Sequence, residues 1–135
     1  MKNPKIVIDT NVFISGILFG GKPRNVIQSV VEGRANLYIS TEILDEIEAV
    51  LLRPKFKLSK TVVRNILHEI EEISSIVEIS NRLKVVKSDK ADDKFIECAV
   101  AGKANFIVSG DIDLLSIAKY KKIEIISPNE FLSKN

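Results

Sequence analysis

Two aspartates in this chain come directly after short apolar runs that predict buried strands. Asp9 closes the run 5–8, and Asp111 follows the run 105–108 after Ser109 and a glycine. Apolar runs of this length that are rich in β-branched residues are typical of strands buried on both faces of a parallel sheet. In open α/β sheets, ligands bind at the carboxyl ends of the strands. The two aspartates therefore predict one shared acidic pocket at that edge.

Several carboxylates that converge on one point predict a site for a hard divalent cation such as Mg²⁺ or Mn²⁺, because these ions prefer oxygen ligands. Asp113 and the pair Asp92 and Asp93 are further candidates, although a pair of acids in the first turn of a helix is also explained by the helix dipole. Like charges held close together raise one another's pKa unless a cation neutralises them. Two bound ions could activate a water and stabilise the leaving oxygen of a phosphodiester.

A glutamate from a predicted helix at 41–52 is a further candidate ligand. On the helical wheel Ile47 lies near the centre of the apolar stripe, and Glu46 and Glu48 flank it. A long side chain at such a boundary can reach the edge of the sheet. The wheel does not choose between the two glutamates, and a solvated surface acid is the default for either.

Other catalytic chemistries lack their residues. The chain has one histidine, His68, and one cysteine, Cys98, which excludes a Cys/His zinc cluster and an internal disulfide. His68 is predicted to lie on the surface, and Cys98 is predicted to be a small core side chain. The segment 20–23 does not fit a phosphate-binding loop, since no Lys-Ser or Lys-Thr ends it.

The apolar pattern predicts strands that alternate with helices. The expected strands are 5–8, 37–40, 83–86, 105–108 and 123–126, and the expected helices are 12–18, 23–32, 41–52, 59–77, 88–102, 114–119 and 128–132. This order predicts an α/β fold with a mostly parallel sheet and helices on both faces. A length of 135 residues fits a single domain over 1–135.

The composition points to a protein of the cytoplasm. No segment approaches the roughly 18 apolar residues of a membrane helix, and no signal-peptide pattern begins the chain. A net charge of +2 means that any contact with nucleic acid would depend on local clusters of lysine and arginine.

Four segments in series resemble the PIN-domain ribonucleases, and above all the VapC-like prokaryotic toxins of toxin–antitoxin pairs. These segments are Asp9-Thr10-Asn11-Val12, the helix from Thr41 to Ile47 leading to Leu52-Arg53-Pro54, the stretch from Asp89 to Ala99, and Ser109 to Leu115. The resemblance extends over the whole chain. It departs from the family pattern at Lys90, where proline is common, and at Ser109, where threonine is common.

The resemblance implies a set of site residues. The four catalytic and metal-binding acids would be Asp9, Glu46, Asp93 and Asp111, with Asp92 and Asp113 as runners-up that hold a metal through water. Asn11 would orient the first acid, and Thr10 and Ser109 would line the site.

The resemblance also implies a three-layer α/β/α sandwich and Mg²⁺- or Mn²⁺-dependent hydrolysis of RNA, with an antitoxin protein as partner. Homodimers are frequent among such proteins, and the long helix expected after residue 59 is a candidate for the contact. Basic residues that could hold RNA are Arg53, Lys55, Lys57 and Lys60, and separately Lys119, Lys121 and Lys122.

Three other functions compete with this one. A phosphatase of the haloacid-dehalogenase type also uses an aspartate after the first strand, but it needs a second carboxylate where this chain has Asn11. A receiver domain needs a lysine after the last strand, where Ser127 and Pro128 stand instead. A catalytically weak PIN-like module that binds RNA or a protein is the alternative from a different functional class.

Overall fold

The computed structural model describes residues 3–79 and 93–134. The expected strand 83–86, the start of the helix expected from residue 88, and Asp92 lie outside these residues.

Six strands form one sheet in the order β3-β2-β1-β4-β6-β5. The strands are β1 (Lys5–Ile8), β2 (Asn36–Ile39), β3 (Ser74–Ile76), β4 (Phe106–Val108), β5 (Lys119–Tyr120) and β6 (Ile123–Ile126). All neighbours are parallel except β5 and β6. The central strand β1 is buried after its first residue, as its apolar run predicts.

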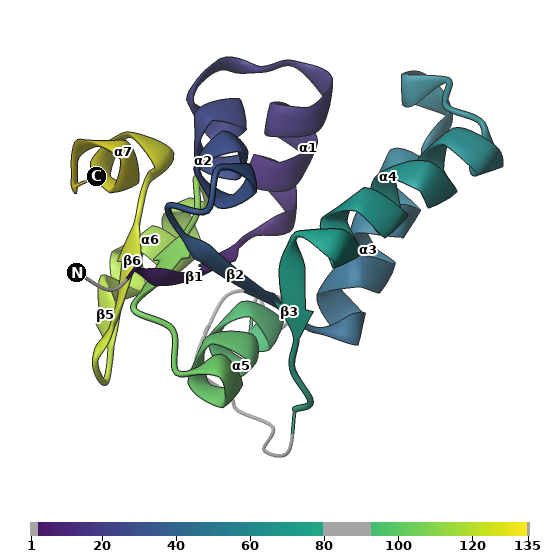
Figure 1. Ribbon diagram of the computed structural model, residues 1–135. Helices are drawn as coiled ribbons and strands as arrows, with labels where there is room; N and C mark the ends of the chain where they lie inside the picture. The colour runs from purple at the N-terminus through teal and green to yellow at the C-terminus, as the bar shows by residue number, and fades with distance from the viewer. Residues whose placement is uncertain (1–2, 80–92, 135) are drawn as a thin grey trace.

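Helices cover both faces of the sheet, which confirms the predicted α/β sandwich. They are α1 (Thr10–Leu18), α2 (Gly21–Val31), α3 (Thr41–Leu51), the 3₁₀ turn η1 (Pro54–Phe56), α4 (Lys60–Glu72), α5 (Asp93–Gly102), α6 (Ile112–Ile117) and α7 (Pro128–Lys134). Figure 1 shows α1, α2 and α7 on one side of the sheet and α5 on the other. The hairpin of α3 and α4 projects beyond the sheet, past β3.

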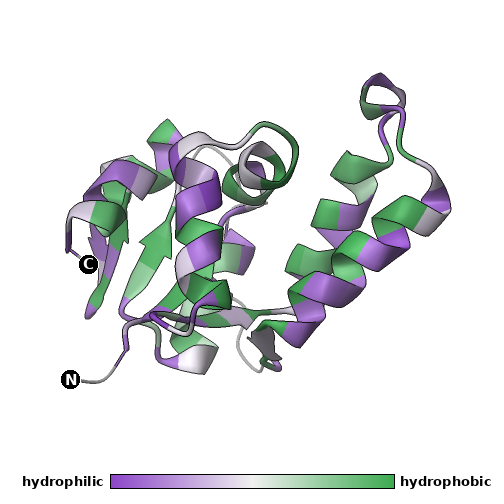
Figure 2. Ribbon diagram, turned by 45° about the horizontal axis from the view of Figure 1, so that its top comes forward, coloured by the Kyte–Doolittle hydropathy of each residue, from purple (hydrophilic) through white to green (hydrophobic). Residues whose placement is uncertain are grey.

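The core lies between the strands and the inner faces of these helices. Figure 2 shows hydrophobic strands flanked by helices whose outer faces are hydrophilic. Fully enclosed side chains come from every layer, among them Phe13, Ile47, Phe95 and Phe131. Among the described residues, no helix is both long and apolar enough to cross a membrane.

The prediction of a helix over 59–77 is wrong at the carboxyl end of this segment. The helix stops at Glu72, and Ser74–Ile76 form the edge strand β3, parallel to β2. The Ser74 hydroxyl donates to the carbonyl of Ile70 at 2.7 Å, a local bond that competes with continued helix. Pairing with β2 then overrides the helical periodicity of the apolar residues, because a neighbouring strand offers the backbone its hydrogen bonds.

The expected boundaries elsewhere shift by a few residues, and two short elements were not expected. The helix expected at 114–119 begins at Ile112 and ends at Ile117, and the final helix continues to Lys134. Both η1 and the two-residue strand β5 are too short to show a period in the sequence.

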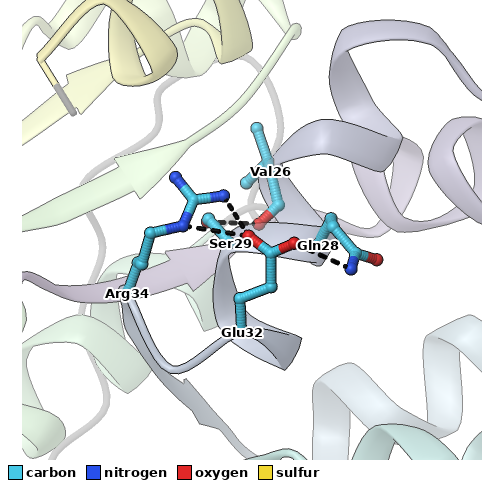
Figure 3. A network of polar contacts seen from close by, with 5 residues as sticks. All are labelled: Val26, Gln28, Ser29, Glu32 and Arg34. Atoms are coloured by element: carbon cyan, nitrogen blue, oxygen red, sulfur yellow. Dashed lines mark hydrogen bonds and ion pairs between the residues drawn. The ribbon is translucent and has the colours of Figure 1, made fainter.

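Local polar contacts terminate α2 before β2 (Figure 3). Glu32 accepts from the Arg34 guanidinium at 3.0 Å and from the Gln28 amide at 3.2 Å. These contacts lower the pKa of the Glu32 carboxyl, with the Arg34 hydrogen bond as the largest cause. The Ser29 hydroxyl donates to the Val26 carbonyl within the same turn of helix. The exposed Glu32–Arg34 contact and the buried Ser29–Val26 contact together hold the chain where it turns toward the central strands.

Candidate active site

The sheet changes its direction of winding between β1 and β4. From β1 the chain moves outward through β2 and β3, and it then returns to β4 on the other side of β1. Such a switch point opens a crevice outside the carboxyl ends of the strands, where α/β proteins bind ligands. Asp9 follows β1, and its amide donates to the Val108 carbonyl at the end of β4 at 3.0 Å.

Asp9 caps helix α1 and is buried, with 3% of its surface exposed. Its Oδ1 accepts from the Val12 amide at 2.8 Å, and its Oδ2 accepts from the Ser109 hydroxyl. Ser109 is fully buried. These two bonds fix the carboxylate in one orientation at the switch point.

Asp111 is the matching N-cap of helix α6. Its Oδ2 accepts from the Leu114 amide at 3.1 Å. Its own amide donates to the Ser109 hydroxyl oxygen at 2.9 Å. One buried hydroxyl therefore joins the two aspartates that follow neighbouring strands.

The surroundings of Asp9 raise the pKa of its carboxyl above the ordinary value. Burial is the largest cause, and the negative charge of Asp111 adds to it. The hydrogen bonds from Ser109 and from the Val12 and Gly110 amides oppose this shift. A buried carboxylate with a second carboxylate beside it is stabilised in its charged form by any cation that enters the crevice.

The structure distinguishes the two glutamates that the helical wheel left open. Glu48 is exposed, whereas the Glu46 side chain is 32% exposed and turns toward the site. Glu46 Oε2 accepts from the Thr10 hydroxyl, next to Asp9. Its Oε1 lies 2.6 Å from Nζ of Lys94. Glu46 is thus the glutamate that α3 brings to the switch point.

Asp93 is the first residue of α5 and is buried at 4% exposure. The contact between its neighbour Lys94 and Glu46 brings the first turn of α5 beside α3. Asp113 lies in the first turn of α6 and is partly exposed.

Within residues 3–79 and 93–134, no three carboxylate, imidazole or thiol groups converge with the spacing of a metal site. Asp9 and Asp111 form an interacting acidic pair, because the charge of Asp111 raises the pKa of Asp9. The donor set nevertheless suits Mg²⁺ or Mn²⁺, because it consists of carboxylate oxygens and because the mutual repulsion of this pair is relieved by a cation. Asp9 and Asp111 are the residues that would hold it, with Glu46 beside them.

Among the described residues, Asn11 makes no side-chain hydrogen bond to Asp9, the acid that the resemblance implies it orients. Its side chain is exposed and makes no hydrogen bond with the other described residues, and the contacts that orient Asp9 come from Ser109 and the Val12 amide. Asn11 instead lines a hollow of about 510 Å³ together with Asp111. This hollow leaves Asp111 open to solvent on one side, and the role expected of Asn11 stays a prediction.

The two basic clusters lie in different parts of the molecule. Arg53, Lys55, Lys57 and Lys60 are exposed around η1, at the tip of the α3–α4 hairpin. Lys119, Lys121 and Lys122 belong to the β5–β6 hairpin. Because β6 runs parallel to β4, that hairpin lies at the amino edge of the sheet, away from the acids.

Reasoning from the sequence missed two features of the site. The first is the capping role of Asp9 and Asp111, which each acid's position three residues before a predicted helix start, at Val12 and Leu114, could have signalled, because an N-cap side chain accepts from the amide three residues on. The second is Lys94, an amphipathic side chain whose surroundings nothing in the local pattern specifies.

The family comparison agrees with this geometry. The PIN domain family matches residues 5–113, and the chain belongs to that family. An uncharacterized protein of Methanocaldococcus jannaschii, MJ1680, is 34% identical over 142 aligned positions, which cover 96% of this chain and 90% of the relative. PIN domains are in general nucleases that use divalent metal ions.

Solved structures share the fold at low sequence identity. VapBC2 from Rickettsia felis, bound to a DNA fragment from their promoter, superposes with a TM-score of 0.63 at 14% identity, covering 91% of this chain and 98% of that one. PAE2754 from Pyrobaculum aerophilum superposes with a TM-score of 0.64 at 13% identity, covering 98% of this chain and 88% of that one. The PIN domain of T. brucei RRP44 superposes with a TM-score of 0.55 at 11% identity, covering 98% of this chain and 80% of that one. These likenesses establish the fold.

Proposed function

We propose that this protein is a Mg²⁺- or Mn²⁺-dependent endoribonuclease and the toxin component of a toxin–antitoxin pair. The observation that carries the proposal is the pair Asp9 and Asp111, held side by side by Ser109 at the switch point of a PIN-family sheet. Glu46 and Asp93 are the third and fourth acids of the proposed site. A bound divalent ion would supply an activated water and charge stabilisation for the phosphodiester oxygens.

The chain's own residues would orient the acids and hold the RNA. Ser109 orients Asp9, and the Thr10 hydroxyl orients Glu46. For the phosphate backbone we favour the basic cluster at the tip of the α3–α4 hairpin over the one on the β5–β6 hairpin, because the latter lies at the amino edge of the sheet. Contacts to phosphates weaken steeply with salt, so RNA affinity should fall as ionic strength rises.

A titration of RNA cleavage with Mn²⁺ tests the proposal. We expect cleavage by the wild-type protein to require Mn²⁺ or Mg²⁺ and to be lost in Asp9→Asn. Glu46→Gln should lose cleavage as well, whereas Glu48→Gln, from the exposed side of the same helix, is the matched control and should retain it. Mn²⁺ should also raise the melting temperature of the wild-type protein, since a ligand that binds only the folded state stabilises it.

Two outcomes would contradict the proposal. One is a melting temperature that does not respond to Mn²⁺ together with cleavage that survives Asp9→Asn. The other is hydrolysis of a simple phosphate monoester at a rate above that of RNA, which would favour the phosphatase alternative. RNA binding without cleavage would favour the catalytically weak module.

An antitoxin partner is part of this proposal, and an apolar groove supports it. The groove has a volume of about 400 Å³ and is lined by Phe13, Ile17, Ile27, Val31, Ile66, Glu69, Ile70, Glu72 and Ile73. Its two glutamates suit an amphipathic segment that carries lysine or arginine beside its apolar residues. Glu69→Lys with Glu72→Lys should weaken capture of a protein encoded next to this one, and unchanged capture would exclude this groove.

A homodimer could instead form through helix α4, which contributes part of this groove. Val62, on α4, is 43% exposed. The mass of the purified protein in solution decides between one copy and two.

A further inference from the structure

The ion pair between Lys94 and Glu46 differs from the other ion pairs of residues 3–79 and 93–134. The Lys94 side chain is 12% exposed and Glu46 is 32% exposed, whereas the side chains of the other two pairs are 46% to 72% exposed. Exposed pairs contribute little, and a long lysine side chain loses rotamer freedom when it is held in one place. An enclosed ammonium beside an acidic crevice therefore calls for an explanation beyond surface charge.

Both oxygens of Glu46 are engaged in this arrangement. Oε1 lies 2.6 Å from the Lys94 ammonium, and Oε2 accepts from the Thr10 hydroxyl. The contacts connect α3 with α5 on one side and with the start of α1 on the other. A carboxylate has about four lone-pair positions, so Glu46 keeps capacity to bind a metal while both partners stay in place.

We propose that Lys94 is a positioning residue that serves as the built-in counter-cation of the acidic site. It holds Glu46 in place while no metal is bound, and its positive charge lowers the affinity of the site for a divalent ion. The inference rests on the proposed metal-binding function and adds to it a residue that sets how tightly the metal binds.

The direction of the effect follows from charge. The ammonium and a divalent ion are attracted to the same carboxylate and repel each other. Coulomb's law for charges of +1 and +2 separated by about 6 Å in a water-like dielectric gives about a tenfold change in affinity, and a lower dielectric gives more. The Thr10 hydroxyl still holds Glu46 when Lys94 is replaced, so the lost repulsion should outweigh the lost orientation.

Calorimetric titration of Mn²⁺ into protein freed of metal tests this inference. We expect Lys94→Gln to bind Mn²⁺ about tenfold more tightly than the wild type, as judged from the Coulomb estimate above. Its melting temperature without metal should be lower and the rise caused by Mn²⁺ larger. Lys94→Arg keeps the charge and should bind Mn²⁺ like the wild type.

Two further variants isolate the site effect. Lys103→Gln changes net charge equally at the other end of α5, where the side chain is exposed, and it should leave the affinity unchanged. In a Glu46→Gln background, Lys94→Gln should change the affinity less, because the Lys94 ammonium is then no longer held beside the site by the Glu46 carboxylate. If Lys94→Gln does not fold, Lys94→Met removes the ammonium, which lies 5.3 Å from the centre of the Phe95 ring, and keeps an apolar side chain of similar length.

The outcomes separate this inference from the proposed function. Mn²⁺ binding that is equal or weaker in Lys94→Gln overturns the counter-cation role and leaves the function standing. If Lys94→Gln binds Mn²⁺ and the wild type does not bind it measurably, the counter-cation role of Lys94 is supported. If neither protein binds Mn²⁺ or Mg²⁺, both proposals fail.

Discussion

The hydroxyl of Ser109 joins the two acids of the site, so its removal should reveal how strongly they depend on it. The hydroxyl donates to Asp9 Oδ2 and accepts from the Asp111 amide, and no part of Ser109 is exposed. A hydrogen bond to a charged group contributes about 1.5–3 kcal/mol. We therefore expect Ser109→Ala to lower the free energy of unfolding by about 2 kcal/mol when Asp9 is charged, which is about 8 °C in melting temperature for a domain of this size.

The loss should grow with pH. The folded-state pKa of Asp9 is raised, so Asp9 contributes stability that is present below its unfolded pKa and is lost as pH rises through its folded pKa. The Ser109 bond is the largest influence that lowers this pKa. Removing the Ser109 bond raises the pKa of Asp9 in the folded protein further. The variant therefore loses more free energy of unfolding at pH values above the ordinary aspartate pKa.

Urea unfolding of metal-free protein at about pH 4 and about pH 8 measures both quantities. Ser40→Ala is the matched control, because Ser40 is a buried N-cap of α3 whose hydroxyl accepts from the Ile43 amide and also bonds the Cys98 thiol. Ser40→Ala should lower the free energy of unfolding by the same amount at both pH values. A Ser109→Ala cost that is also independent of pH, or that is below about 0.5 kcal/mol, would refute the reasoning.

Three further predictions concern the scaffold. Gly16→Ala should lower the free energy of unfolding by about 1–2 kcal/mol in urea, because the new Cβ would lie 2.7 Å from Ile27 Cδ1 where α1 and α2 pack together; a stabilised variant would contradict this. The Cys98 thiol should resist alkylation at neutral pH until the protein unfolds, because burial raises its pKa to about 12; rapid labelling of the folded protein would contradict this. Ser59→Ala should cost about 1 kcal/mol through the lost cap of α4 at Val62, and an unchanged melting temperature would exclude that role.

The sequence was most informative where burial and local chemistry agree. The strands 5–8 and 123–126 match the structure residue for residue, because apolar β-branched runs in the middle of a sheet have no competing pattern. The helix beginning at Thr41 was predicted from its cap and its stripe, and both are present. These elements alone bring Asp9 and Glu46 to one edge of the sheet.

The sequence was least informative where a long-range partner decides the outcome. Ile73 and Val77, on either side of β3, continue the apolar period of α4, and only the neighbouring strand β2 shows that the residues between them pair as a strand. The choice between Glu46 and Glu48 likewise depends on Thr10 and Lys94, which are distant in the sequence. Side-chain partners of this kind leave no periodic signal.

The capping role of Asp9 changes how the proposed chemistry should be tested. Asp9 accepts from the Val12 amide at the start of α1 and also receives the buried Ser109 hydroxyl. Asp9→Ala removes both contacts and should cost about 1 kcal/mol for the cap and about 1–3 kcal/mol for the unpaired hydroxyl, so lost cleavage in that variant would mix misfolding with lost chemistry. Asparagine caps a helix as well as aspartate does, and it removes a charge that burial disfavours. At pH values above the ordinary aspartate pKa, we expect metal-free Asp9→Asn to have a melting temperature equal to or higher than that of the wild type. We also expect this variant to lose both the stabilisation by Mn²⁺ and the cleavage of RNA. A large fall in the melting temperature of metal-free Asp9→Asn would show instead that this carboxylate is needed chiefly for the fold.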